Sequence, residues 1–190
     1  GPRGSGKGLL AEAIHFGSNR DGFVLLNCTS ISERTLERLI FGYLDIASSE
    51  WRQGYLETLN NGTLVLDSVS GLSSRLQGLL LEAIQDGKIL GADSQQVSLS
   101  VRFIAIDSPE LLEFVESGLF DQRLFDLLAN TILQVPSLKE RMDERHNDVL
   151  YLTQYFITKY ADENHLPELG EQAKEALVRY SFPDNVRELQ

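Results

Sequence analysis

The first eight residues, Gly1-Pro2-Arg3-Gly4-Ser5-Gly6-Lys7-Gly8, decide how the rest of the chain is interpreted. They fit the pattern G-x-x-x-x-G-K and lead directly into a helical pattern. Glycines let backbone N–H groups turn toward phosphate oxygens, the helix N-terminus adds partial positive charge, and the lysine adds a full charge. The phosphate-binding residues predicted here are Gly1, Arg3, Gly4, Ser5, Gly6, Lys7 and Gly8.

We call this stretch the phosphate loop. It departs from the standard motif at one position, and it allows one alternative interpretation. Position 8 is glycine, where serine or threonine would ordinarily supply a hydroxyl to Mg²⁺. The alternative is a flexible glycine-rich terminus in which Gly1-Pro2 is left over from purification. A second phosphate-site motif elsewhere in the chain favours the binding interpretation.

Four short apolar runs predict the strands of a sheet. They are residues 23–28 (FVLLNC), 63–67 (TLVLD), 101–107 (VRFIAID) and 131–135 (TILQV). Nearly continuous apolar runs are typical of strands buried on both faces of a parallel sheet. A helical pattern over residues 73–87, with Gly87 as its expected C-cap, separates the second run from the third. This alternation predicts an α/β fold with a mostly parallel sheet.

Beyond Pro136 the pattern becomes entirely helical. We expect helices starting at Asn147, spanning residues 170–180, and starting again at Asp184 or Asn185. The predicted organisation is a nucleotide-binding α/β subdomain over residues 1–139 and a helical lid over residues 140–190. The strand that should precede the phosphate loop is expected to be missing, and the lid is expected to be truncated.

Composition excludes several classes of protein. The 190 residues include 17 Lys and Arg against 28 Asp and Glu, a net charge of −11, with a single cysteine. Such a surface repels nucleic acids and anionic membranes, and one cysteine cannot form an internal disulfide or a cysteine-based zinc cluster. No apolar run reaches the roughly 20 residues that span a bilayer. A cytoplasmic protein without membrane contact is expected.

The run TLVLD ends in the second candidate motif. Asp67 would lie at the carboxyl end of a parallel strand, where ligands bind in open α/β sheets, and is the candidate Mg²⁺ ligand. The alternative is an aspartate that only begins a turn. Ser68 follows, and a serine is a poor general base at neutral pH.

Taken together, these blocks resemble the AAA+ domain of bacterial enhancer-binding proteins, the NtrC class of transcription activators. The matching segments, in order, are GPRGSGKGLLAEAIH (1–15), FVLLNCTSI (23–31), the segment from NGTLVLD to QDG (61–87), VRFIAIDS (101–108), VPSLKER (135–141) and FPDNVREL (182–189). The resemblance implies a three-layer αβα P-loop domain with a helical lid, ATP or ADP with Mg²⁺ as ligand, and Arg187 as a lid residue that contacts the nucleotide. It also implies self-association from dimer to hexamer, a receiver-like phosphorelay domain before the chain and a DNA-binding helix-turn-helix domain after it.

Several positions depart from that family pattern. The GAFTGA loop that engages sigma-54 is replaced by YLDIASSEWRQ (43–53), the acid after Asp67 is Ser68, and the sensor I asparagine is Ser108. The two arginine-finger positions are Asp121 and Leu127, and Arg123 lies nearby with the wrong spacing. A trans-acting arginine is worth on the order of 10³–10⁵ in rate. We therefore expect a degenerate member without confidently assigned catalytic residues, with little or no ATP hydrolysis.

Three functional hypotheses follow. The first is the central nucleotide-binding domain of a sigma-54-independent transcription regulator that acts on RNA polymerase with a sigma-70-type factor. Cyclic di-GMP, a ligand associated with biofilm control in such regulators, is an alternative ligand, with Arg3 and Arg52 as its contacts. The second is a working ATPase in which Ser68 acts with Glu57 or another acid. The third is a ligand-free oligomerisation scaffold. Trp51 could stack on a base or on a partner protein. The alternative is that it packs against the edge of the sheet.

Overall fold

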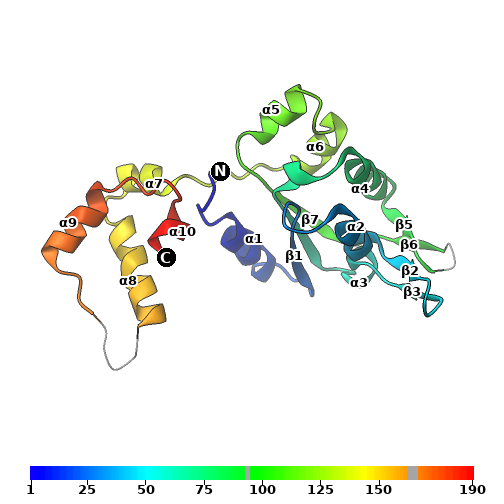
Figure 1. The fold of residues 1–190 in the computed structure, drawn as a ribbon, viewed down its shortest axis with the longest axis horizontal. Helices are drawn as coiled ribbons and strands as arrows, with labels where there is room; N and C mark the ends of the chain where they lie inside the picture. The colour runs from blue at the N-terminus through cyan, green and yellow to red at the C-terminus, as the bar shows by residue number, and fades with distance from the viewer. Residues whose placement is uncertain (93–94, 162–166) are drawn as a thin grey trace. The chain divides into compact units, whose positions relative to one another are not determined.

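The computed structural model describes residues 1–92, 95–161 and 167–190. The chain forms two compact units (Figure 1): residues 8–132 make the first, and residues 1–7 together with 133–190 make the second. We call them the sheet unit and the lid unit. Residues 1–7 of the phosphate loop therefore belong to the lid unit, although they precede the sheet unit in sequence. The expected boundary between residues 139 and 140 stays a prediction.

The sheet unit contains a three-stranded parallel sheet. Its strands are β1 (Phe23–Asn27), β4 (Thr63–Asp67) and β7 (Arg102–Ile106), in the order β1-β4-β7. The register aligns Asn27 with Asp67 and Asp67 with Ile106, so the three strands end level with one another. Burial on both faces was expected for every strand, but only β4 shows it. Leu25 of β1 is 40% exposed because an edge strand has a neighbour on one side only.

Helices cover both faces of this sheet, which confirms the three-layer αβα architecture. Successive side chains of a strand point to opposite faces. On β4, Val65 packs with Ala11 of α1 (Lys7–Phe16). Leu64 and Leu66 pack on the other side, in the main core, with buried side chains of α2 (Glu33–Phe41) and α4 (Ser74–Asp86). The core therefore lies mainly between β4 and these two helices.

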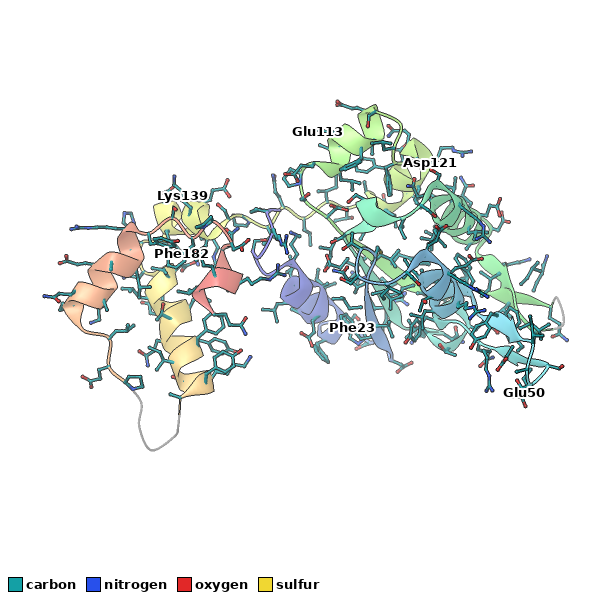
Figure 2. The ribbon with its side chains drawn as sticks, in the orientation of Figure 1. Phe23, Glu50, Glu113, Asp121, Lys139 and Phe182 are labelled. Atoms are coloured by element: carbon teal, nitrogen blue, oxygen red, sulfur yellow. The ribbon has the colours of Figure 1, made fainter. Side chains whose placement is uncertain are left out.

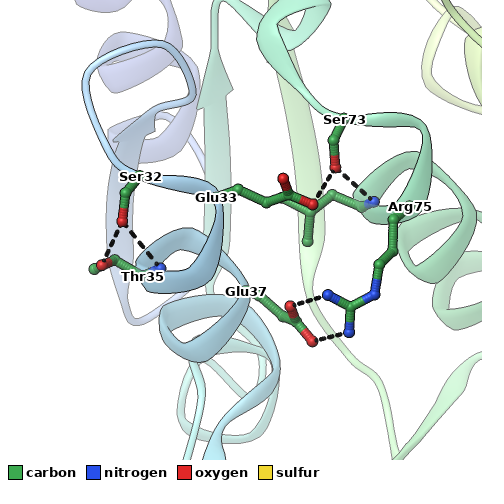
Figure 3. A network of polar contacts seen from close by, with 7 residues as sticks. Ser32, Glu33, Thr35, Glu37, Ser73 and Arg75 are labelled. Atoms are coloured by element: carbon green, nitrogen blue, oxygen red, sulfur yellow. Dashed lines mark hydrogen bonds and ion pairs between the residues drawn. The ribbon is translucent and has the colours of Figure 1, made fainter.

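The N-termini of α2 and α4 are capped and joined to each other (Figure 3). The Ser32 hydroxyl accepts a hydrogen bond from the Thr35 amide, and Ser73 does the same for Leu76. Such caps satisfy amides that have no partner inside the helix. Three hydrogen bonds then link the helices: the Ser73 hydroxyl donates to Glu33 at 2.6 Å, and the Arg75 guanidinium donates to both oxygens of Glu37 at 2.7 Å. At the far end of α4, Gly87 is left-handed with φ +61°, as predicted.

Two short antiparallel hairpins were not predicted. One joins β2 (Tyr43–Asp45) to β3 (Glu50–Arg52), and the other joins β5 (Lys88–Leu90) to β6 (Gln96–Ser98). Strands of three residues leave no readable periodicity in a sequence. The first hairpin occupies the segment that replaces GAFTGA, and Figure 2 labels Glu50 within it. The remaining short elements of the sheet unit are α3 (Tyr55–Thr58), the 3₁₀ turn Val69–Gly71, α5 (Leu111–Glu116) and α6 (Gln122–Leu128).

The predicted strand at residues 131–135 is wrong. These residues form no strand in the structure, and Ile132 and Leu133 are 70% and 57% exposed. A strand needs a neighbouring strand to pair its backbone groups, and none of the described strands pairs with this run. The Val135 carbonyl instead abuts Gly1, and the chain passes from one unit to the other at this point.

The lid unit is helical, as predicted. It contains α7 (Leu138–Glu144), α8 (Asp148–Tyr160), α9 (Glu171–Arg179) and α10 (Val186–Leu189). Helix α7 was not predicted from the charged run at residues 139–145. It begins with a capping box formed by Ser137 and Glu140. Leu138, Met142, Val149 and Phe182 form the buried core, and Figure 2 labels Phe182. In the described ranges we find no helix with the length and apolar character of a membrane span.

Candidate functional site

The phosphate loop has the backbone that a phosphate cradle requires. Gly4 and Gly6 adopt φ values of +73° and +96°, in the left-handed region that other residues avoid. A Cβ at Gly6 would have open space within 4 Å, so this side of the loop has room for a ligand. The Ser5 hydroxyl donates to the Pro2 carbonyl at 2.8 Å, which closes the loop upon itself. These features fit a phosphate group.

Lys7 places its charge inside the loop. Its ammonium donates to the carbonyl oxygens of Gly1 and Pro2, both at 2.7 Å. Lys7 is also the first residue of α1, so the charge lies at the positive end of a helix. An anionic group reaching this loop would meet both the ammonium and the helix N-terminus, which together favour phosphate.

Asn185 fastens the loop to the lid helices. It is 4% exposed, its side-chain amide donates to the Arg3 carbonyl at 2.7 Å, and its side-chain oxygen accepts from the Leu138 amide at 2.8 Å. One buried side chain therefore holds both the loop and the start of α7. Sequence reasoning located Asn185 only as a helix start and missed this role.

Gly4 and Arg187 come together in the same unit. A Cβ at Gly4 would overlap the carbonyl oxygen of Asp184 and would lie 3.2 Å from the Cβ of Arg187. The loop therefore packs directly on the FPDNVREL segment, and only glycine permits this approach. Arg187 is exposed on α10, while Arg3 is exposed on the loop itself. Both guanidinium groups are available to an anion bound at the loop.

In the sheet unit, polar residues gather where the three parallel strands end. Asp67 ends β4 and receives a long hydrogen bond, 3.4 Å, from the Asn27 amide at the end of β1. Asp107, directly after β7, accepts from the backbone amides of Ser70 at 2.6 Å and Ser108 at 2.8 Å. The sequence analysis selected Asp67 and Ser108, but not Asn27 or Asp107. Asn27 is the last residue of β1 and Asp107 directly follows β7, so a polar residue at the carboxyl end of an apolar run was the signal that could have identified them.

Ser68 occupies a strained position at this edge. Its φ is 58°, in the left-handed region, and its amide donates to the Ile106 carbonyl of the adjacent strand at 2.9 Å. Ser68 then leads into the 3₁₀ turn that Asp107 holds through Ser70. The position that carries an acid in the family pattern is thus part of a fixed turn, and it presents a hydroxyl.

The chemistry of this edge favours a cation. Burial, followed by the negative charges of Asp67 and Asp107, raises the pKa of the Cys28 thiol to about 12. Cys28 is therefore a protonated, inert core thiol, and the two carboxylates share one neighbourhood. Within the ranges described, no three Asp, Glu, His or Cys side chains converge as a metal site. A Mg²⁺ ion at Asp67 would need further oxygen ligands, such as phosphates or water.

The two arginine-finger positions carry no cation. Asp121 caps α6 by accepting from the amides of Arg123 and Leu124. Its carboxylate also pairs with the Arg123 guanidinium at 2.9 Å, and this hydrogen bond lowers the pKa of Asp121. Arg123 is thus tied back to its own helix, and Leu127 adds an exposed apolar side chain.

The first hairpin uses its aromatic and acidic residues internally. The Trp51 indole donates to one Glu57 oxygen at 2.8 Å, and Gln53 donates to the other at 3.4 Å. Trp51 is therefore half-buried and held by Glu57, while its packing against the sheet edge stays a prediction. Arg52 pairs with Glu50 at 3.2 Å and with Asp45 at 3.9 Å. Arg52 belongs to the sheet unit and Arg3 to the lid unit.

Comparisons with known proteins agree with this architecture. Residues 1–134 match the sigma-54 interaction domain, and residues 143–190 match the AAA+ ATPase lid domain. The transcriptional regulatory protein TyrR of Enterobacter agglomerans is 34% identical over 197 residues, covering 100% of this chain and 37% of TyrR. ZraR of Escherichia coli K12 is 35% identical over 198 residues, covering 100% of this chain and 44% of ZraR.

A solved structure gives the same result. NtrX from Brucella abortus in complex with ATP superposes with a TM-score of 0.85 and 30% identity, covering 99% of this chain and 43% of NtrX. The chain therefore spans less than half the length of these relatives.

Proposed function

The chain belongs to the sigma-54 interaction domain family of AAA+ proteins, and we propose that it is the nucleotide-binding central domain of a DNA-binding transcription regulator. Its ligand is ATP or ADP with Mg²⁺. The phosphate loop would hold the phosphates with Lys7, Arg187 would contact them from α10, and Asp67 would hold the metal ion. When bound, Mg²⁺ neutralises phosphate charge. Residues 1–8 and Asp67 fit this ligand by their chemistry.

One observation carries this proposal: the glycine cradle is intact and is joined to the lid. Gly4 and Gly6 keep their left-handed backbone, and Asn185 ties the Arg3 carbonyl to α7. A loop without a ligand role would not require two glycines in the left-handed region together with a buried amide that holds the loop in place. The NtrX relative, solved in complex with ATP, supports the same ligand.

We further propose that hydrolysis is slow or absent. Ser68 replaces the water-positioning acid, Ser108 replaces the sensor asparagine, and no cation stands at position 121 or 127. Losing the arginine alone costs on the order of 10³–10⁵ in rate. Glu57, the acid considered as a substitute, is bonded to Trp51 and Gln53, which weakens the ATPase alternative.

The expected protein partners follow from the same differences from the family sequence pattern. The hairpin at residues 43–53 lacks the GAFTGA sequence, so we propose a sigma-54-independent regulator acting on RNA polymerase with a sigma-70-type factor. It would self-associate as a dimer to hexamer and contact DNA through a helix-turn-helix domain outside this chain. A receiver-like domain would supply a phosphorelay signal. A cytoplasmic location follows from action on bacterial DNA.

Cyclic di-GMP, with its link to biofilm control, is the alternative ligand. Arg3 is exposed beside the phosphate loop and supports it. Arg52 supports it less, because a ligand there would compete with Glu50 and Asp45.

The test is calorimetric titration with ATP and Mg²⁺, compared with Lys7→Ala. Lys174→Ala, which removes a surface lysine paired with Glu171, is the matched control. We expect binding that Lys7→Ala weakens at least tenfold and that the control leaves unchanged. Phosphate release measured on the same samples should stay near background, whereas turnover lost in Lys7→Ala would establish the ATPase.

Two further arms of the test address the other hypotheses. Binding of cyclic di-GMP without ATP would replace the proposed ligand. If neither nucleotide binds, and gel filtration shows the same assembly for wild type and Lys7→Ala, the scaffold hypothesis holds instead.

A further inference from the structure

A second cavity lies in the sheet unit, on residues that the nucleotide site does not use. It is a groove of about 670 Å³ along α2, lined by Glu33, Arg34, Glu37, Arg38, Gly42, Tyr43 and Arg75. All of these residues lie within 8–132, whereas the phosphate loop up to Lys7 belongs to the lid unit. The volume is within the range of small-molecule sites, about 300–1,000 Å³.

The acidic side chains of this groove already have partners. Figure 3 shows Glu37 held by both arms of Arg75 and Glu33 held by the Ser73 hydroxyl. The charge of Glu37 is therefore balanced by Arg75. These bonds also join α2 to the start of α4 at this wall of the groove.

The two arginines of α2 are different. Arg34 and Arg38 lie one helical turn apart and line the same groove. Among the residues that the structure describes, neither forms an ion pair, whereas Arg52, Arg75, Arg123, Arg141 and Arg179 all do. Arg3, Arg20, Arg102, Arg145 and Arg187 also have no ion pair among the described residues, so what sets Arg34 and Arg38 apart is that they line one groove as neighbours. Like charges one turn apart also repel each other.

Tyr43 organises one of these arginines. The Arg38 guanidinium carbon lies 4.4 Å from the centre of the Tyr43 ring, a cation–π contact. This contact holds the guanidinium plane in place while leaving its N–H groups to hydrogen-bond a ligand. Guanidinium groups match phosphate oxygens bidentately and also stack on planar rings.

We propose that this groove is a second ligand site that binds a small phosphate ester of nucleotide size through Arg34 and Arg38. The phosphate would lie between the two guanidinium groups and relieve their repulsion. Glu33 is positioned to accept N–H donors of an attached base, and its charge disfavours a long polyanion. Because Tyr43 begins the first hairpin, a ligand here would contact both α2 and the segment that replaces GAFTGA.

The experiment uses the Lys7→Ala chain, so that the phosphate loop does not contribute. Calorimetry would be run with GMP, cyclic di-GMP and inorganic phosphate as probes. We expect at least one of the three to bind, and the combined changes Arg34→Gln and Arg38→Gln to weaken that binding at least tenfold. Inorganic phosphate binding as tightly as the nucleotides would assign the site to free phosphate, whereas a preference for GMP or cyclic di-GMP would assign it to an ester.

Arg123→Gln, which removes an exposed arginine outside the groove, is the matched control and should leave binding unchanged. Because Arg38 contacts Tyr43, the single change Arg34→Gln is the second variant and should weaken binding without altering the melting temperature. Absence of binding by every probe, or binding that the Arg34 and Arg38 changes do not affect, overturns the proposal. So does binding of an acidic peptide with none of the phosphate probes. ATP binding in the chain with Lys7 intact tests the proposed function separately.

Discussion

Replacing Asn185 with alanine should loosen the phosphate loop and the lid unit together. The Asn185 side chain is the only described group that bonds both the Arg3 carbonyl and the Leu138 amide. In Asn185→Ala the Leu138 amide, at a fully buried residue, loses its partner, and so does the half-buried Arg3 carbonyl. An unsatisfied buried polar group costs about 1–3 kcal/mol.

The two losses together predict a decrease of about 2–4 kcal/mol in the unfolding free energy of the lid unit. Backbone strain adds to this for alanine, because position 185 has a φ of 55°. Asn185→Gly removes the bonds without that strain, so it isolates the hydrogen-bond part. Asn185→Asp keeps the acceptor for Leu138, but it loses the donor to Arg3 and buries a carboxylate against that carbonyl oxygen, so it should cost at least as much as Asn185→Gly.

The measurement is urea unfolding combined with hydrogen exchange in peptides from residues 1–7 and 133–142. Exchange of the Leu138 amide should accelerate strongly in Asn185→Ala and Asn185→Gly, but little in Asn185→Asp. Peptides of the sheet unit serve as the internal control. The prediction is wrong if the unfolding free energy of Asn185→Gly stays within about 0.5 kcal/mol of wild type and the Leu138 amide remains protected. In that case the two hydrogen bonds of Asn185 do not stabilise the lid unit.

Three further predictions concern single positions. Gly4→Ala should abolish ATP binding and destabilise the lid unit, because the new Cβ would overlap a backbone carbonyl. The control is Gly78→Ala in α4, where the Cβ has open space. It should stabilise the sheet unit by about 1 kcal/mol in thermal unfolding. Cys28 should resist alkylation at pH 9 until urea is added. Because its pKa rises from 9.0 to about 12 on folding, its contribution to the unfolding free energy falls as pH increases from 9 toward 12. The decrease of the unfolding free energy with pH should therefore be smaller in Cys28→Ala. Glu57→Ala should shift the emission of Trp51, the single tryptophan, to longer wavelength and increase its quenching by acrylamide; unchanged emission would contradict the packed indole.

Local sequence signals predicted those elements that local forces determine. The run at 63–67 became β4 with the same bounds, because four consecutive strand-forming residues are followed by the polar Asp67. Gly87 ends α4 because the left-handed backbone there suits glycine. The helices of the lid begin near Asn147, Gly170 and Asn185, as their capping residues indicated.

Features that depend on distant partners were not predictable. The run at 131–135 has strand composition, but pairing rather than composition makes a strand. The three-residue strands of both hairpins have no pattern to detect. The bond from the Ser70 amide to Asp107 spans 37 residues, and Glu57 accepts from an indole on the unpredicted hairpin, so both roles depend on how the chain folds.

The bond from Asn185 to Arg3 also has a kinetic consequence. It joins positions 182 residues apart, so it can form only after residue 185 has been synthesised. The sheet unit, closed within residues 8–132, can fold on the ribosome well before that. Until Asn185 emerges, the first seven residues have no lid to pack against, and their glycines remain open to proteases. Long-range closure of this kind is slow, because the entropy of a large loop must be overcome before any contact forms. We therefore expect a chain halted before residue 185 to contain a folded sheet and an unformed phosphate loop.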